Sequence, residues 1–299
     1  MSAPARDKWA EWLLERRHGG DSAAHAATMQ YLAPVRDRVL DNAALTSGDT
    51  LLDVGCGDGL VAFGGLDRVG QGGRVIFSDV SRDLLERCRE LAGEAGVLDR
   101  CEFVEARAED LTPIEDESVA AATTRSVLIY LPLENKPRAF EEFFRVLKPG
   151  GRLSMFEPIN RFAWPEPADR FFGFDATPVL PLARKVKAVY ERSRGDETLI
   201  DFDERDLIAF AEQVGFAEIQ LVYEATVRHR AGVCWGGASS WEVFLHQSGN
   251  PCAPTLAEAL AEALTPSEHE EFVAHLRPRY EALEGTERFA AAYLSAVKR

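Results

Sequence analysis

The sequence has few cysteines and no long apolar run. Its 299 residues include five cysteines, an odd number without the paired spacing of a zinc site or a disulfide framework. We therefore expect no metal site, and reduced thiols in a cytoplasmic protein. Nowhere do about 18 apolar residues follow one another, so the sequence predicts no membrane span. Charged residues at positions 6 to 8 precede any apolar run, which argues against a secretory signal segment.

Basic residues are scarce relative to acidic ones. The chain has 34 Lys and Arg against 49 Asp and Glu, a formal net charge of −15. A protein that grips a phosphate backbone needs clustered basic side chains, so we expect no nucleic-acid partner. The hydrophobic content of 46% is that of a globular protein. Because no linker rich in Pro, Ser or Gly divides the chain, we expect one elaborated domain.

The pattern of apolar residues changes its period near residue 46. Before it, apolar residues recur at three-and-four spacing, which predicts a helical N-terminal cap over residues 1–45. After it, in residues 46–250, strand-like runs alternate with helical segments, which predicts a doubly wound α/β domain with a mostly parallel sheet. Strands are expected at residues 49–54, 74–79, 101–106, 119–128, 152–157, 216–227 and 239–247.

Two segments depart from this alternation. Residues 158–200 contain five prolines among aromatic residues such as Trp164, so they cannot form a plain crossover helix. We expect a lid-like insertion there, and the alternative is a hydrophobic patch that closes the core. Residues 251–299 are expected to form a helical extension, whose apolar faces would supply core or the surface of a homodimer.

A glycine-rich turn and a later acid carry the most information about function. The strand at residues 49–54 runs into Gly55-Cys56-Gly57-Asp58-Gly59, where the backbone can turn sharply and approach a ligand. A dinucleotide fingerprint requires a further glycine where this chain has Leu60. The next strand ends in Asp79, whose carboxylate can accept hydrogen bonds from the hydroxyls of an adenosine ribose; alternatively, Asp79 is only a helix cap.

These features, with Arg145-Val146-Leu147-Lys148-Pro149-Gly150-Gly151, resemble the class I S-adenosylmethionine-dependent methyltransferases, and within them the branch of quinone-biosynthesis and small-molecule enzymes. The resemblance covers about residues 45–160. It implies a Rossmann-like sheet of seven strands whose last strand is antiparallel. It also implies a methyltransferase that uses S-adenosylmethionine on a small-molecule acceptor.

The resemblance also assigns roles to residues in the turn and beyond it. It implies that Asp53 organises the turn, that Asp79 binds the ribose and that Val80 lies against the adenine. Arg107 stands where the family has an acid that reads the adenine, so Ala108 or Glu109 would take that role. The cofactor-binding set that follows is Asp53, Gly55, Cys56, Gly57, Gly59, Asp79, Val80, Arg107, Ala108, Glu109, Arg125 and Ser126.

The acceptor and the proton chemistry are less determined. Methyl transfer from a sulfonium requires alignment and exclusion of water, and a base only if the acceptor must lose a proton. His229 and Glu157 are candidates for that base by their expected position at the carboxyl edge of the sheet. The acceptor atom is open between oxygen, nitrogen, carbon and sulfur.

Three alternative functions remain at this point. A non-catalytic adenosylmethionine-binding protein would keep Asp79 but lack an acceptor pocket. A nicotinamide-dependent oxidoreductase would share the sheet but needs the glycine absent at Leu60. Metal-thiolate chemistry, as in arsenic methyltransferases, would require clustered cysteines, and only Cys234 and Cys252 are expected near the pocket.

Overall fold

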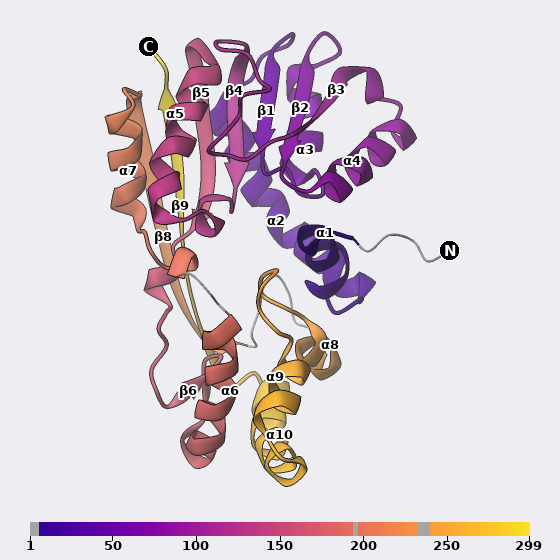
Figure 1. Cartoon of the computed structure of the whole chain (residues 1–299), viewed down its shortest axis with the longest axis vertical. Helices are drawn as coiled ribbons and strands as arrows, with labels where there is room; N and C mark the ends of the chain where they lie inside the picture. The colour runs from indigo at the N-terminus through magenta and orange to yellow at the C-terminus, as the bar shows by residue number, and fades with distance from the viewer. Residues whose placement is uncertain (1–5, 194–196, 232–239) are drawn as a thin grey trace.

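The computed structural model, which describes residues 6–193, 197–231 and 240–299, has a seven-stranded sheet as its centre (Figure 1). The strand order is β3-β2-β1-β4-β5-β9-β8, and β9 is antiparallel to both of its neighbours. The predicted doubly wound, mostly parallel sheet is therefore confirmed. The strands are β1 (Thr50–Val54), β2 (Arg74–Asp79), β3 (Cys101–Glu105), β4 (Val119–Arg125), β5 (Leu147–Pro158), β8 (Ala217–Ala231) and β9 (Gly285–Val297).

Helices cover both faces of this sheet. One face packs against α2 (Ser22–Ala43), α3 (Leu60–Val69) and α4 (Arg82–Glu94). The other face packs against α5 (Lys136–Val146) and α7 (Glu204–Gln213). Since parallel strands buried on both faces read as continuous apolar runs, the strands before residue 160 were recognisable from the sequence. Within the described residues, no helix has the length and apolarity that crossing a membrane requires.

A second, smaller core lies beyond the carboxyl ends of the parallel strands. We call it the helical unit: it comprises α6 (Leu180–Ser193), α8 (Trp241–His246), α9 (Leu256–Ala263), α10 (Pro266–Glu281) and the hairpin of β6 (Arg170–Phe171) and β7 (Phe174–Asp175). The buried rings of Phe171, Phe174, Phe244 and Phe272 hold these elements together. Residues 171–190 therefore share a core with the C-terminal helices, and both lie below the sheet in Figure 1.

Two expectations from the sequence are wrong. The seventh strand is Gly285–Val297 in the C-terminal segment, which we expected to be helical, whereas residues Trp241–His246 of the expected strand form helix α8. The alanine-rich β9 resembles a helix because alanine has high helix propensity. Its alternate side chains nevertheless enter the cores on opposite faces: Ala290 and Ala292 on one, Ala291 and Tyr293 on the other.

Most of residues 6–45 are helical, as expected. A short helix α1 (Lys8–Glu11) continues into a π-helical turn, Trp12–Arg16, before α2 begins at Ser22. Asp7 caps α1 by accepting hydrogen bonds from the amides of Trp9 and Ala10 at 2.9 and 3.0 Å. We call residues 7–17 the N-terminal segment, and it lies beside the carboxyl edge of the sheet (Figure 1).

Candidate active site

The glycine turn after β1 is shaped by close contacts that leave no room for side chains. Gly55 and Gly57 have φ of 65° and 57°, a region that favours glycine. A Cβ on Gly55 would lie 2.3 Å from Cγ2 of Val127, and one on Gly59 would lie 2.5 Å from the ring of Phe63. Gly55 and Gly57 line the cavity described below, whereas Cys56 and Gly59 are buried and do not line it.

Asp53 lies under the turn and does not reach the cavity. Its carboxylate accepts hydrogen bonds from the hydroxyl of Thr123 at 2.8 Å and from the amide of Ala62 at 3.1 Å. It thereby joins β1 to β4 and to the first turn of α3. Burial raises the pKa of this carboxyl to about 7. This placement agrees with the expected role of organising the turn.

Asp79 closes the opposite side of the glycine turn. One of its carboxylate oxygens accepts the amide of Gly57 and the other accepts the amide of Ser81, both at 2.9 Å. Burial raises the pKa of the carboxyl. Asp79 also lines the cavity. Ser81, and not Asp79, caps α4 with its side chain, so the helix-cap alternative for Asp79 is not needed.

The segment after β3 forms the next wall. Val80 is 42% exposed, although it is a large apolar residue, and it lines the cavity together with Arg107, Ala108 and Glu109. Nε of Arg107 donates to Glu109 at 2.8 Å. The Glu109 carboxylate is much less exposed than the Arg107 guanidinium. Glu109 thus presents a carboxylate to this wall beside Arg107.

The loop after β4 is held by Glu157. Its Oε1 accepts the amides of Val127 and Leu128 at 2.9 and 3.1 Å, and the carboxyl is completely buried. Burial raises the pKa of Glu157 to about 7. Glu157 does not line the cavity, whereas Arg125 and Ser126 do. These contacts favour a role in positioning the Ser126 loop and do not favour Glu157 as a catalytic base.

His229 lies away from the cavity. It is exposed near the end of β8, where Nδ1 is 3.3 Å from the hydroxyl of Thr286. It is not one of the lining residues, so its placement does not favour the role of general base. Cys234, which we also expected near the pocket, lies outside the described residues, and Cys252 is exposed and lines no part of the cavity.

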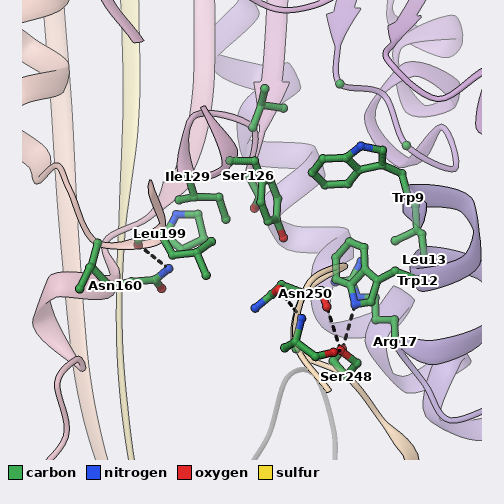
Figure 2. A pocket seen from close by; sticks show the side chains of 18 of the residues that line it. Trp9, Trp12, Leu13, Arg17, Ser126, Ile129, Asn160, Leu199, Ser248 and Asn250 are labelled. Carbon is green, nitrogen blue, oxygen red and sulfur yellow. Dashed lines mark hydrogen bonds between the residues drawn. The ribbon is translucent and has the colours of Figure 1, made fainter. Parts of the chain in front are cut away.

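The N-terminal segment covers the cavity, which the sequence did not indicate. Figure 2 shows Trp9 and Trp12 projecting from this segment toward the loop that carries Ser126. The ring of Trp9 meets the ring of Tyr130 edge-on at 4.9 Å. Trp12 Nε1 donates to the carbonyl of Ser248 at 2.9 Å, which joins the segment to the helical unit (Figure 2).

One cavity of about 840 Å³ runs through all of these elements. At one end lie the glycine turn and Asp79, and beyond Tyr130 and Asn160 it continues into the helical unit. The side-chain amide of Asn160 donates to the carbonyl of Leu199 at 2.9 Å (Figure 2). At the far end the lining includes the aromatic side chains of Trp164, Phe171, Phe172, Tyr190, Phe244 and Phe289, together with the charged side chains of Glu166, Lys187, Glu191 and Glu287. The cavity therefore has room for more than one small molecule.

Comparisons with known proteins agree with this geometry. Residues 51–151 match a family described as a methyltransferase domain. An arsenite methyltransferase of Halobacterium salinarum is 32% identical over 126 residues, which is 42% of this chain and 31% of that protein. A ubiquinone/menaquinone biosynthesis C-methyltransferase UbiE of Brucella abortus is 41% identical over 110 residues, which is 37% of this chain and 40% of that protein.

A solved structure extends the likeness in fold to most of the chain. A geranyl diphosphate methyltransferase, determined in complex with SAM, has a TM-score of 0.52 at 20% identity and covers 94% of this chain and 91% of its own. The fold and the glycine turn define a Rossmann-like methyltransferase domain. Over residues 51–151 the chain is similar to methyltransferases, which agrees with the resemblance to the class I S-adenosylmethionine-dependent family that the sequence motifs indicated. It spans less than half the length of the two curated relatives.

Proposed function

We propose that this chain transfers the methyl group of S-adenosylmethionine to a small, largely apolar acceptor. The observation that carries the proposal is the continuity of the cavity. Asp79 and the glycine turn lie at one end, aromatic side chains lie at the other, and Ser126, Tyr130 and Asn160 lie between them. A cofactor at the first end and an acceptor at the second would meet at the carboxyl edge of the sheet, where ligands of open α/β sheets bind.

The described residues fit the cofactor. Asp79 presents a carboxylate to the cavity that suits the ribose hydroxyls, and the exposed Val80 suits the face of the adenine. Ala108 and Glu109 would read the adenine edge, and Gly55 and Gly57 let the backbone approach the methionine part. Asp53, Cys56 and Gly59 would support this site from below without touching the cofactor, which narrows the set expected from the sequence.

The chain would contribute orientation and exclusion of water. When bound, the cofactor supplies an electrophilic methyl group on a sulfonium. The N-terminal segment and the helical unit close the cavity on two sides, which removes water from the line of attack. Burial raises the pKa of Tyr130 to about 12, so its hydroxyl stays protonated and would orient the acceptor as a hydrogen-bond donor. Asn160 would fix the acceptor from the opposite side.

The lining restricts the acceptor. No histidine lines the cavity in the described parts of the chain, so the proposed acceptor needs no imidazole base. Arsenite, the substrate named for one relative, is a poor candidate because no described cysteine lines the cavity. The aromatic far end suits a planar or prenyl-like molecule. We further propose a cytoplasmic location, a homodimer and no nucleic-acid partner.

Two rival functions make different forecasts. A nicotinamide-dependent oxidoreductase would be stabilised by NADH and not by adenosylhomocysteine, the demethylated cofactor. A non-catalytic adenosylmethionine-binding protein would bind adenosylhomocysteine but show no turnover. A screen of apolar, planar acceptors with labelled adenosylmethionine separates that case from the methyltransferase.

The ribose assignment is tested by calorimetry. We expect adenosylhomocysteine to bind in the micromolar range and Asp79→Ala to weaken it by about 1–3 kcal/mol, the cost of charge-assisted hydrogen bonds. Asp79→Asn keeps the volume of the side chain and should weaken binding in the same direction. Asp99→Ala, at an exposed acid, serves as the control. Equal affinity in Asp79→Ala, Asp79→Asn and the unmodified protein would show that Asp79 does not bind the cofactor.

A further inference from the structure

Two guanidinium groups line the cavity and form no ion pair with any carboxylate in the part of the chain that the structure describes. Arg17 lies over the ring of Trp12, with its Cζ 5.4 Å from the ring centroid, and takes part in no ion pair among the described residues. Arg125 has one hydrogen bond, from Nη1 to the hydroxyl of Ser126 at a long 3.4 Å. The neighbouring Arg16, by contrast, is paired with Glu258 at 2.6 Å outside the cavity.

The charges of Arg17 and Arg125 act on each other. Burial, and after it the charge of Arg125, lowers the pKa of Arg17 to about 10. Arg17 remains protonated at neutral pH, so two like charges share one partly enclosed space. Asp58 in the glycine turn offsets this repulsion in part, but it forms no ion pair or hydrogen bond with Arg17. Like charges in a low-dielectric site are costly unless an anion lies between them.

The two arginines come from elements that a shared ligand would join. Arg125 ends β4, and Arg17 follows the π-helical turn Trp12–Arg16. Leu13 in that turn packs on the glycine turn, since a Cβ on Gly57 would lie 3.1 Å from its Cδ2. Figure 2 shows Arg17 beside Trp12 on the same segment. An anion held by both arginines would therefore tie the N-terminal segment to the sheet.

We propose that Arg17 and Arg125 together bind the carboxylate of a ligand in this cavity. The guanidinium fork matches a carboxylate in two parallel hydrogen bonds, which a lysine could not reproduce. This proposal rests on the proposed function, because the carboxylate has two sources there. One source is the amino-acid end of the cofactor, and the other is an acid group on the acceptor.

The first arm of the test compares two ligands that differ in that group. Adenosylhomocysteine carries the carboxylate, whereas 5′-methylthioadenosine lacks the whole amino-acid end. For Arg17→Met and Arg125→Met we expect about 10- to 100-fold weaker binding of adenosylhomocysteine, and binding of methylthioadenosine within about threefold of the unmodified protein. Arg16→Met removes a neighbouring arginine outside the cavity and should change neither affinity.

The second arm tests the acceptor as the source. Thermal shifts with benzoate and with acetate are measured with and without adenosylhomocysteine. An acid group on the acceptor is supported if benzoate stabilises the unmodified protein and Arg16→Met. The same stabilisation should be lost in Arg17→Met and Arg125→Met. The proposal would be overturned if Arg17→Met and Arg125→Met weakened the binding of adenosylhomocysteine and methylthioadenosine alike. It would also be overturned if the two substitutions weakened neither the binding of adenosylhomocysteine nor the stabilisation by benzoate. If the unmodified protein bound neither adenosine ligand, the proposed function would fail. The thermal shift with benzoate would still show whether Arg17 and Arg125 bind a carboxylate.

Discussion

At the scale of single residues, the buried acids of this site act by supporting it. Glu157 was a candidate base, yet its carboxylate holds the amides of Val127 and Leu128, and its second oxygen is buried without a hydrogen bond. Asp53 likewise joins strands beneath the glycine turn. The identity of these residues was readable from the sequence, but their distance from the cavity depends on side-chain packing that motif spacing does not contain.

The raised pKa of Glu157 predicts a pH dependence of stability. The pKa is about 7 in the folded protein against an ordinary 4.5, so the folded state holds its proton where the unfolded state has lost it. Stability from this group is therefore fully present below pH 4.5 and is lost as the pH rises toward 7. The loss is about 3 kcal/mol by linkage.

We expect Glu157→Gln to match the unmodified protein near pH 5 and to be more stable than it by about 2–3 kcal/mol at pH 8. The glutamine amide cannot ionise, so the free energy of unfolding of Glu157→Gln does not change with pH through this side chain. Urea denaturation at several pH values measures the difference. Glu134→Gln, at an exposed acid, should follow the unmodified protein throughout. Parallel curves for the unmodified protein and Glu157→Gln would show that Glu157 is ionised when folded.

At the scale of elements, the strands of the glycine turn were predictable and the last strand was not. β1 and β2 are consecutive in the chain and adjacent in the sheet, so their motifs and their pairing are local in the sequence. β9 inserts between β5 and β8, a pairing that joins residues about 140 positions apart. No periodicity in residues 285–297 indicates that partner, and the alanines favour a helix instead.

The N-terminal segment was missed for the same reason. The spacing of its tryptophans predicts a helix, and a helix is present. Its contacts are distant in sequence: Asp7 accepts the hydroxyl of Ser81 at 2.6 Å, and Trp9 meets Tyr130. A signal was available, because two tryptophans within four residues on a short helix are unlikely to remain in water. The cavity wall they form could still not be located from the sequence.

The position of β9 can be tested with two adjacent residues. Leu294 is fully buried between β5 and β8, whereas its neighbour Ser295 is partly exposed. Leu294→Ala should lower the free energy of unfolding by about 2–5 kcal/mol, the cost of a core cavity. Ser295→Ala should change it by about 0.5 kcal/mol or less. Small effects of both substitutions would fit a surface helix and contradict the strand.

At the scale of the whole molecule, the cavity lies between two packed bodies. The segment at residues 158–200, expected as a lid, divides between them: Phe162 packs against the core of the sheet, and Phe171 and Phe174 pack within the helical unit. Trp164 and Phe172 line the cavity. Closure, which stays a prediction, would accordingly move the helical unit with its core intact and not a detached loop.

Trp164→Ala should raise the KM for the acceptor or lower kcat, and leave the affinity for adenosylhomocysteine within about threefold. Trp164 lies at the acceptor end of the cavity, so it would contact the acceptor and not the cofactor. Hydrogen exchange over residues 160–200 should slow when both ligands are present. Exchange that is equally slow in the free protein, with a loss of stability and unchanged kinetics in Trp164→Ala, would show that this segment is only core.

The central place of β9 also fixes when this sheet can be completed during synthesis. A nascent chain that ends before Gly285 already contains β5 and β8, but their facing edges have no strand between them. Unpaired edges of this kind recruit other chains. The nascent protein therefore passes through an interval in which the cofactor end is assembled and the sheet is open. Chaperone binding should concentrate in that interval, and it should end once residue 297 is free to pair.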